Sequence, residues 1–116
     1  MRLCHFDDLP DGGSRGFDPR ASGRDTLFVV RRGRVLHGWV NACPHHGTPM
    51  AWRKDEYLDA ARERIVCGAH GARFEIATGL CTLGPCLGER LTPVPLTLDD
   101  DGAVHLAAIP QEEISP

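Results

Sequence analysis

Two short segments combine cysteine and histidine at a spacing that suits metal binding. They are Cys43-Pro44-His45-His46-Gly47 and Cys67-Gly68-Ala69-His70-Gly71. Each segment places one thiolate and one imidazole in a tight loop, and both groups are protein ligands of zinc and of iron–sulfur clusters. Each ends in glycine, which lets the backbone turn closely around a bound group. We therefore predict that Cys43, His45, Cys67 and His70 bind a metal cofactor, and we predict no catalytic residue.

The pairing of one cysteine with one histidine in each loop narrows the choice of metal. Common zinc motifs pair cysteine with cysteine and histidine with histidine. Here the pairs are mixed, and 21 residues separate His45 from Cys67. The two segments resemble the boxes of Rieske proteins, which read Cys-x-His-x-Gly and Cys-x-x-His-Gly. The resemblance implies a [2Fe–2S] cluster with the two cysteines on one iron and the two histidines on the other. A structural zinc module that mediates binding is the alternative.

The resemblance extends over roughly residues 1–108. Arg73-Phe74-Glu75 and Thr78-Gly79 follow the second box as similar residues do in Rieske ferredoxins, and Gly84-Pro85 resembles the loop that covers the cluster. The resemblance implies an all-β Rieske fold, in which an antiparallel β-sandwich base is built from both ends of the chain. A small cluster-binding subdomain is then inserted at about residues 42–86 of a single domain, 1–116.

Length, charge and composition exclude several other classes of protein. The 116 residues suit one domain, and the net charge of −3 lacks the basic character of a nucleic-acid binder. No apolar run approaches the roughly 18 residues of a membrane helix, and the N-terminus lacks the apolar stretch of a signal peptide. We therefore expect a cytoplasmic protein with neither nucleic-acid nor membrane partners. Thiols stay reduced in that compartment, so close Cys/His pairs indicate metal before disulfides.

Short runs between glycines and prolines favour strands over helices. Expected strands cover residues 26–30, 35–41, 64–66, 72–75, 95–98 and 103–107. Hairpin turns are expected at 31–34 and at 99–102, where an Asp-Gly pair is a strong turn signal. Residues 55–64 contain good helix formers, but their flanks read as strands, so we favour a hairpin over a helix. The first 25 residues are expected to be dominated by loops.

Four positions near the boxes predict the character of the cluster. High-potential respiratory Rieske proteins resemble this chain but carry a hydroxyl donor and a tyrosine where it has Ala72 and Phe74. They also carry a disulfide between the positions of Thr48 and Ala69. Hydrogen bonds to the sulfurs stabilise the added electron and raise the potential. We therefore expect a low-potential, ferredoxin-type cluster within a family range of about −150 to +300 mV.

The remaining cysteines and histidines are assigned no ligand role. Cys81 and Cys86 flank the covering loop, and the sequence leaves open whether they are packed thiols or a disulfide or redox pair. Cys4 is expected to be a packed thiol, and His46 an exposed loop residue. His5, His37 and His105 are expected to be structural or solvated.

These observations together predict a soluble one-electron carrier that is not itself an enzyme. Its partners would be a reductase and a terminal oxygenase or reductase, docking at the exposed imidazole edges through a small interface. Arg53 and Lys54 are candidate contacts at its rim. One alternative is a small Rieske subunit of a nitrite-reductase-like enzyme, and another is a redox sensor. A complete Rieske oxygenase is excluded by length, because no segment supplies a mononuclear iron site.

Overall fold

A computed structural model describes residues 1–44 and 47–107, and the elements it describes there are almost entirely strands. These are β1 (Arg2–His5), η1 (a 3-10 helix, Phe6–Asp8), β2 (Ser14–Phe17), β3 (Leu27–Arg32), β4 (Val35–Val40), β5 (Arg64–Val66), β6 (Arg73–Glu75), β7 (Cys81–Leu83), β8 (Pro93–Val94), β9 (Leu96–Leu98) and β10 (Ala103–Leu106). Every described strand pairing is antiparallel. The predicted all-β fold class is confirmed.

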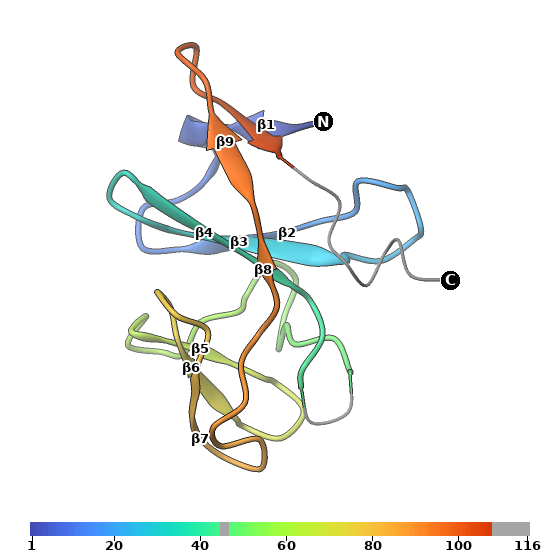
Figure 1. The fold of residues 1–116 in the computed structure, drawn as a ribbon, viewed down its shortest axis with the longest axis vertical. Coiled ribbons are helices and arrows are strands. Elements are labelled where there is room, and N and C mark those ends of the chain that lie inside the picture. The colour runs from blue at the N-terminus through green and yellow to red at the C-terminus, as the bar shows by residue number, and fades with distance from the viewer. Residues whose placement is uncertain (45–46, 108–116) are drawn as a thin grey trace.

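The strands form three sheets, with orders β1-β10-β9, β2-β3-β4-β8 and β5-β6-β7. Figure 1 shows the first sheet at the top, the four-stranded sheet across the middle and the third sheet at the bottom. The upper two sheets use strands from both ends of the chain. The strands of the third sheet all lie between β4 and β8 in the sequence.

Strand β3 divides the interior into two cores because its first four residues are all buried. Side chains alternate between the faces of a strand, so Leu27 and Val29 enter one core and Phe28 and Val30 enter the other. The first, which we call the base core, comprises Cys4, Leu9, Phe17, Leu27, Val29, Val40, Val94, Val104 and Leu106. The second, which we call the cysteine-rich core, comprises Phe28, Val30, Trp39, Cys43, Met50, Tyr57, Leu58, Ile65, Cys67, Ala72, Phe74, Ile76, Cys81, Cys86 and Leu91.

Residues 55–64 form the hairpin that we favoured over a helix. Leu58 pairs with Ile65 in an antiparallel bridge. The Arg62 N–H donates to the Asp59 carbonyl at 2.9 Å and closes the turn. The Asp59 carboxylate accepts from the next turn residue, Glu63, at 3.0 Å. A carboxylate that satisfies turn N–H groups favours a turn over a helix.

The first 25 residues are mostly loop and turn, as expected, but they also contribute β1 and β2. Strand β1 pairs with β10, and β2 pairs with β3. Each has only four residues, which is too short for a clear alternating pattern in the sequence. Their partners lie far along the chain or beyond a long loop, so the sheet supplies the hydrogen bonds that the local sequence does not indicate. No helix in residues 1–44 and 47–107 is long and apolar enough to cross a membrane.

Candidate metal centre

The first ligand loop, residues 43–48, follows β4 and is closed by two backbone hydrogen bonds. The Cys43 N–H donates to the Thr48 carbonyl at 2.8 Å, and the Gly47 N–H donates to the Cys43 carbonyl at 2.6 Å. Gly47 has a φ of +69°, a conformation that glycine adopts without steric cost. The loop therefore turns back on Cys43, whose side chain points into the interior and is 0% exposed.

The second ligand loop, residues 67–72, repeats this arrangement. The Cys67 N–H donates to the Ala72 carbonyl at 2.9 Å, and the Gly71 N–H donates to the Cys67 carbonyl at 2.8 Å. Gly71 has a φ of +73°, close to that of Gly47. Cys67 is also 0% exposed. Two loops with the same hydrogen bonds and the same buried first residue are suited to hold equivalent ligands.

The two ligand loops have an inner and an outer side. Both cysteines belong to the cysteine-rich core, whereas the second loop is exposed from Gly68 to Gly71, including His70. The Gly68 N–H donates to the Met50 carbonyl at 2.8 Å and ties the second loop to the segment that follows the first. A centre held here would have its cysteine side inside the protein and its histidine side at the surface.

The structure describes three of the four predicted ligands. His45, together with the neighbouring His46, lies outside the described residues. Within residues 1–44 and 47–107, no group of three or more His, Cys, Asp or Glu side chains has an arrangement that could hold a single metal ion. A binuclear centre does not require such a group, because each iron of a Rieske cluster takes only two protein ligands. The donor set therefore fits a [2Fe–2S] cluster.

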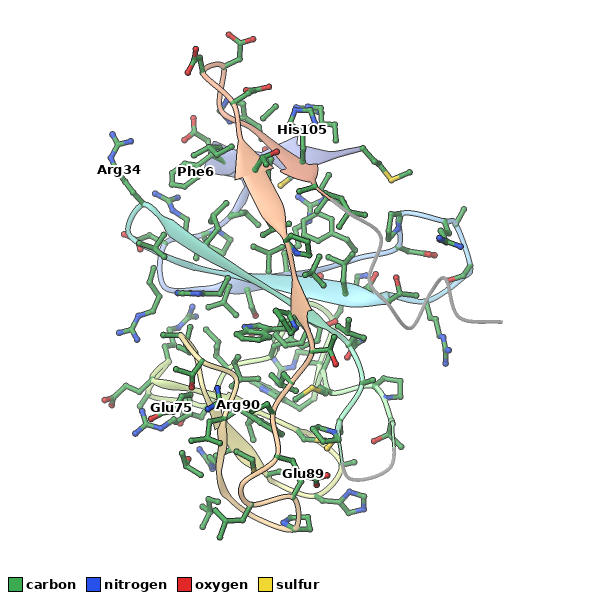
Figure 2. All side chains as sticks on the ribbon, in the orientation of Figure 1. Phe6, Arg34, Glu75, Glu89, Arg90 and His105 are labelled. Atoms are coloured by element: carbon green, nitrogen blue, oxygen red, sulfur yellow. The ribbon has the colours of Figure 1, made fainter. Side chains whose placement is uncertain are left out.

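A third loop, residues 83–87, lies against the second ligand loop. A Cβ added to Gly84 would lie 2.8 Å from the Cα of Ala72, so the two backbones are in close contact. Leu83 and Leu87 on this loop are 60% and 67% exposed. Figure 2 places Glu89, just beyond this loop, at the lower end of the molecule, far from His105 at the upper end. The sequence prediction of a covering loop at Gly84-Pro85 agrees with this position.

Cys81, at the start of β7, and Cys86, within the third loop, are both buried thiols. Their Sγ atoms are 3.3 Å apart, and the Cys81 Sγ donates to the Leu83 carbonyl at 3.3 Å. Burial raises the pKa of the Cys86 thiol, and so do its neighbours Cys81 and Cys43. Both thiols are free in this structure, so it contains packed thiols and not a disulfide. A redox role for the pair stays a prediction.

Asn41 positions the first ligand loop and was not identified from the sequence. Its Oδ1 accepts from the Met50 N–H at 2.8 Å, and its Nδ2 donates to the Asp25 carbonyl at 2.9 Å. Asn41 precedes the loop and Met50 follows it, so one side chain ties the two ends together. A polar residue that ends the apolar run of β4 was the available signal.

The Ser14 hydroxyl of β2 holds the segment between the ligand loops through two hydrogen bonds. The Ser14 hydroxyl donates to the Asp55 carbonyl at 2.7 Å and accepts from the Tyr57 N–H at 3.1 Å. The Tyr57 ring stacks on Phe28 of β3, with ring centroids 4.2 Å apart. Burial raises the pKa of Tyr57 far above its usual value, with the Asp25 and Asp55 charges adding to the effect. Tyr57 is therefore a neutral packing residue.

The candidate rim residues both have partners within the chain. Lys54 Nζ lies 3.1 Å from the Asp25 carboxylate, and the Arg53 guanidinium lies over the Trp52 ring at 5.1 Å from its centroid. A role for Arg53 and Lys54 in partner binding stays a prediction.

Cys4, His5 and His105 occupy structural positions in the base of the molecule. Cys4 is 5% exposed in the base core. His5 Nε2 lies 2.9 Å from the Asp101 carbonyl, and His105 Nε2 lies 3.0 Å from the Asp99 carboxylate. These contacts support the β9–β10 hairpin, which is remote from the ligand loops (Figure 1).

Comparison with known families identifies the group to which this arrangement belongs. The profile of the Rieske [2Fe-2S] domain matches residues 1–107. The chain belongs to the Rieske [2Fe-2S] domain family. The predicted family, the predicted Rieske fold and the predicted [2Fe–2S] cofactor are therefore confirmed, and the family's cofactor takes the place of the zinc alternative.

The Rieske domain is similar to curated proteins and to solved structures. It is 31% identical over 77 residues to apoptosis-inducing factor 3 of Mus musculus and of Homo sapiens, covering 66% of this chain but only 11% of either protein. A ferredoxin of carbazole 1,9a-dioxygenase from Nocardioides aromaticivorans IC177 superposes with a TM-score of 0.67 at 25% identity, covering 90% of this chain and 93% of the other. For the Sphingomonas yanoikuyae B1 ferredoxin the TM-score is 0.70 at 27% identity, covering 91% and 95%. These neighbours agree with the predicted role of a Rieske electron carrier.

Proposed function

We propose that Cys43, His45, Cys67 and His70 hold the [2Fe–2S] cluster, with the cysteines on one iron and the histidines on the other. The equivalent hydrogen bonds of the two ligand loops support this assignment, as does the complete burial of both cysteines. When bound, the cluster supplies a centre that accepts or donates one electron. The cluster-binding subdomain would extend over about residues 42–86 of a single domain, 1–116.

The function that this site supports best is that of a soluble, cytoplasmic one-electron carrier between a reductase and a terminal oxygenase. The observation that carries the proposal is that the site has a buried side and an exposed side: both cysteines are buried and the His70 loop is exposed. A partner that docks on that loop would contact the outer side of the centre directly. In this scheme the chain's residues hold and shield the cluster, and catalysis occurs on the partner.

The ferredoxin neighbours favour a carrier over the small Rieske subunit of a nitrite-reductase-like enzyme. The two ferredoxins described above are matched over more than nine-tenths of their own length, and the first serves a carbazole dioxygenase. The apoptosis-inducing factor relatives are matched over only about a tenth of theirs. We therefore propose an aromatic-ring oxygenase as the class of terminal partner. The interface would be small, as in other transient redox complexes.

The cluster is proposed to have a low, ferredoxin-type potential. Ala72 and Phe74 are both 0% exposed and face the cysteine-rich core without a polar side-chain atom. Neither side chain can donate to the sulfurs of a cluster. The buried Thr48 hydroxyl has no hydrogen-bond partner among the described residues, so it is a candidate for a single weak contact. A midpoint potential well above the middle of the family range would contradict this proposal.

The ligand assignment is tested by spectroscopy on the intact chain. His70→Ala should abolish assembly of the cluster, and His70→Cys should retain a cluster with an altered visible and paramagnetic spectrum. His105→Ala is the matched control, because His105 lies on the remote hairpin, and it should leave both spectra unchanged. An unchanged spectrum in His70→Ala would refute the assignment.

The carrier role is tested by reconstitution with a purified Rieske-type ring-hydroxylating oxygenase and an NADH-dependent ferredoxin reductase. Product should form only when the loaded chain is present, and its rate should saturate with chain concentration. If the oxygenase cannot reoxidise the reduced chain in a stopped-flow experiment, an oxygenase partner of this class is excluded.

A further inference from the structure

The Cys86 thiol has two other cysteine side chains, Cys81 and Cys43, as neighbours in the buried interior. It is 1% exposed, and its Sγ is 3.3 Å from the Sγ of Cys81. It also makes a side-chain hydrogen-bonding contact with Cys43. All three cysteines belong to the cysteine-rich core. Cys86 is therefore in contact with the sulfur of a proposed cluster ligand.

The hydrogen bonds of the two outer cysteines determine where the Cys86 proton can go. The Cys81 thiol already donates to the Leu83 carbonyl at 3.3 Å, so its sulfur can serve Cys86 only as an acceptor. The other acceptor is Cys43, whose sulfur becomes an anionic thiolate when it binds iron. Hydrogen bonds to charged acceptors are roughly twice as strong as those between neutral groups. The loaded state therefore favours donation from Cys86 to Cys43.

The geometry points to Cys86 as a positioning residue that raises the reduction potential of the cluster by donating its thiol proton to the Cys43 sulfur. The Cys81 sulfur contacts the same thiol at 3.3 Å. This inference rests on the proposed ligation by Cys43. Cys86 would supply a side-chain hydrogen-bond donor to a site in which the side chains of Ala72 and Phe74 supply none. It would also give a role to the Cys81–Cys86 pair, which is not among the proposed ligands.

The backbone keeps the Cys86 thiol at this position. The Cys81 N–H donates to the Glu89 carbonyl at 2.8 Å, and the Glu89 N–H donates to the Cys86 carbonyl at 2.9 Å. On the opposite side, Gly84 is in close contact with Ala72 of the second ligand loop. The loop that carries Cys86 is therefore fixed at both ends and pressed against the site.

The test is the midpoint potential of three variants, measured by voltammetry on fully loaded protein. Cys86→Ala removes the donor and should shift the reduction equilibrium about fivefold toward the oxidised form, as expected for one hydrogen bond. A tenfold change corresponds to about 59 mV for one electron, so the expected fall in potential is about 40 mV. Cys86→Ser keeps a donor and should restore the wild-type potential or exceed it.

Cys81→Ala is the matched control, because it removes an equally buried thiol of the same pair that has no proposed contact with a ligand. It should shift the potential by less than half as much as Cys86→Ala. Equal shifts in Cys81→Ala and Cys86→Ala, or no shift in Cys86→Ala, would overturn the inference. A Cys81–Cys86 disulfide in the purified wild-type protein, detected by mass spectrometry after alkylation, would also overturn it, because a disulfide has no proton to donate.

A measurement on the wild-type protein keeps the inference testable if Cys86→Ala fails to load. The infrared S–H stretching band that is missing in Cys86→Ser should move to lower wavenumber when the cluster is reduced, because the acceptor sulfur gains charge. An S–H band that does not move on reduction would overturn this inference but not the proposed ligand assignment. A wild-type chain without a Rieske spectrum would overturn the proposed ligands as well, so the two failures are distinguishable.

Discussion

The base core and the cysteine-rich core lie on opposite faces of the same sheet, yet they are built differently. Apart from Cys4, the base core is formed by aliphatic and aromatic side chains, most of them on strands of four to six residues. The cysteine-rich core contains four of the five cysteines, and the sheet beneath it consists of three strands of three residues each. Such short strands carry few hydrogen bonds and little apolar surface. We therefore expect the base to be stable by itself and the cluster-binding region to depend on its cofactor.

The largest expected effect comes from removing the cluster, by chelation after reduction or by Cys67→Ala. Metal binding contributes to folding where a site is not fully formed without it. The opening free energies of amides in β5, β6 and β7 should then fall toward zero, the range of mobile segments. Amides of β3 and β10 should keep their protection. Hydrogen exchange followed by mass spectrometry measures both, and equal protection of β5–β7 with and without the cluster would contradict the comparison.

A cavity in the base core should lower the stability of the whole protein and leave the cluster unaffected. Leu27 is 0% exposed, so Leu27→Ala should lower the free energy of unfolding by about 2–5 kcal/mol. The visible spectrum of the folded variant should be unchanged, because Leu27 faces away from the cysteine-rich core. Urea denaturation followed by circular dichroism measures the loss. Leu98→Ala, at a position 47% exposed, is the control and should change stability by less than about 0.5 kcal/mol.

The contact between the four-stranded sheet and the segment that follows β6 can be tested at Gly79. A Cβ at this position would lie 2.7 Å from the Trp39 ring of β4, and its φ is +73°. Gly79→Ala should cost about 1–3 kcal/mol from overpacking, in addition to backbone strain. Gly88→Ala is the matched control, since Gly88 has a φ of +87° but no atom within 4 Å of its Cβ position. Equal losses in thermal denaturation would show that the Trp39 contact is unimportant.

The smallest expected effect concerns the hairpin turn at residues 59–64. Burial opposes ionisation of Asp59, but hydrogen bonds from the Glu63 and Arg64 N–H groups and the charge of Arg73 lower its pKa. A carboxyl whose pKa is lowered on folding contributes stability above its unfolded pKa of about 3.9, and that contribution is lost as pH falls through the lowered value.

Asp59→Asn should therefore reduce the free energy of unfolding by about 1 kcal/mol at pH 7 and by less at pH 3. Urea titrations at the two pH values measure the difference. Asp100→Asn, in the exposed β9–β10 turn, is the control, and its difference from the wild type in free energy of unfolding should be the same at both pH values. If the stability difference between the wild type and Asp59→Asn grew as pH fell, the prediction would be contradicted.

Local signals explain which features the sequence predicted. The two ligand boxes, the hairpin near Gly33 and the Asp-Gly turn at Gly102 are each contained in a few neighbouring residues. Residues 55–64 were ambiguous because helix and hairpin differ there only through the pairing of Leu58 with Ile65. That pairing depends on the strand that follows the turn, and not on the turn itself.

Features that depend on distant partners could not be predicted in this way. The Ser14 hydroxyl bonds to Asp55, 41 positions away, and β1 pairs with β10 at the other end of the chain. The contact of Cys86 with Cys43 likewise joins loops that are separated by the whole third sheet. A single sequence does not encode such a contact in any periodic pattern. The residues that position the site were therefore harder to identify than its proposed ligands.

The entry and exit of the inserted segment have a consequence for protein engineering. Strands β4 and β8, which flank the insertion, pair with each other at Trp39 and Pro93, and the Val40 N–H donates to the Thr92 carbonyl at 2.9 Å. The inserted segment therefore begins and ends at two neighbouring, hydrogen-bonded strands of the base. A short turn between β4 and β8 could replace the segment and give a shortened protein that binds no cluster. The excised segment is a candidate for grafting between adjacent antiparallel strands of another scaffold.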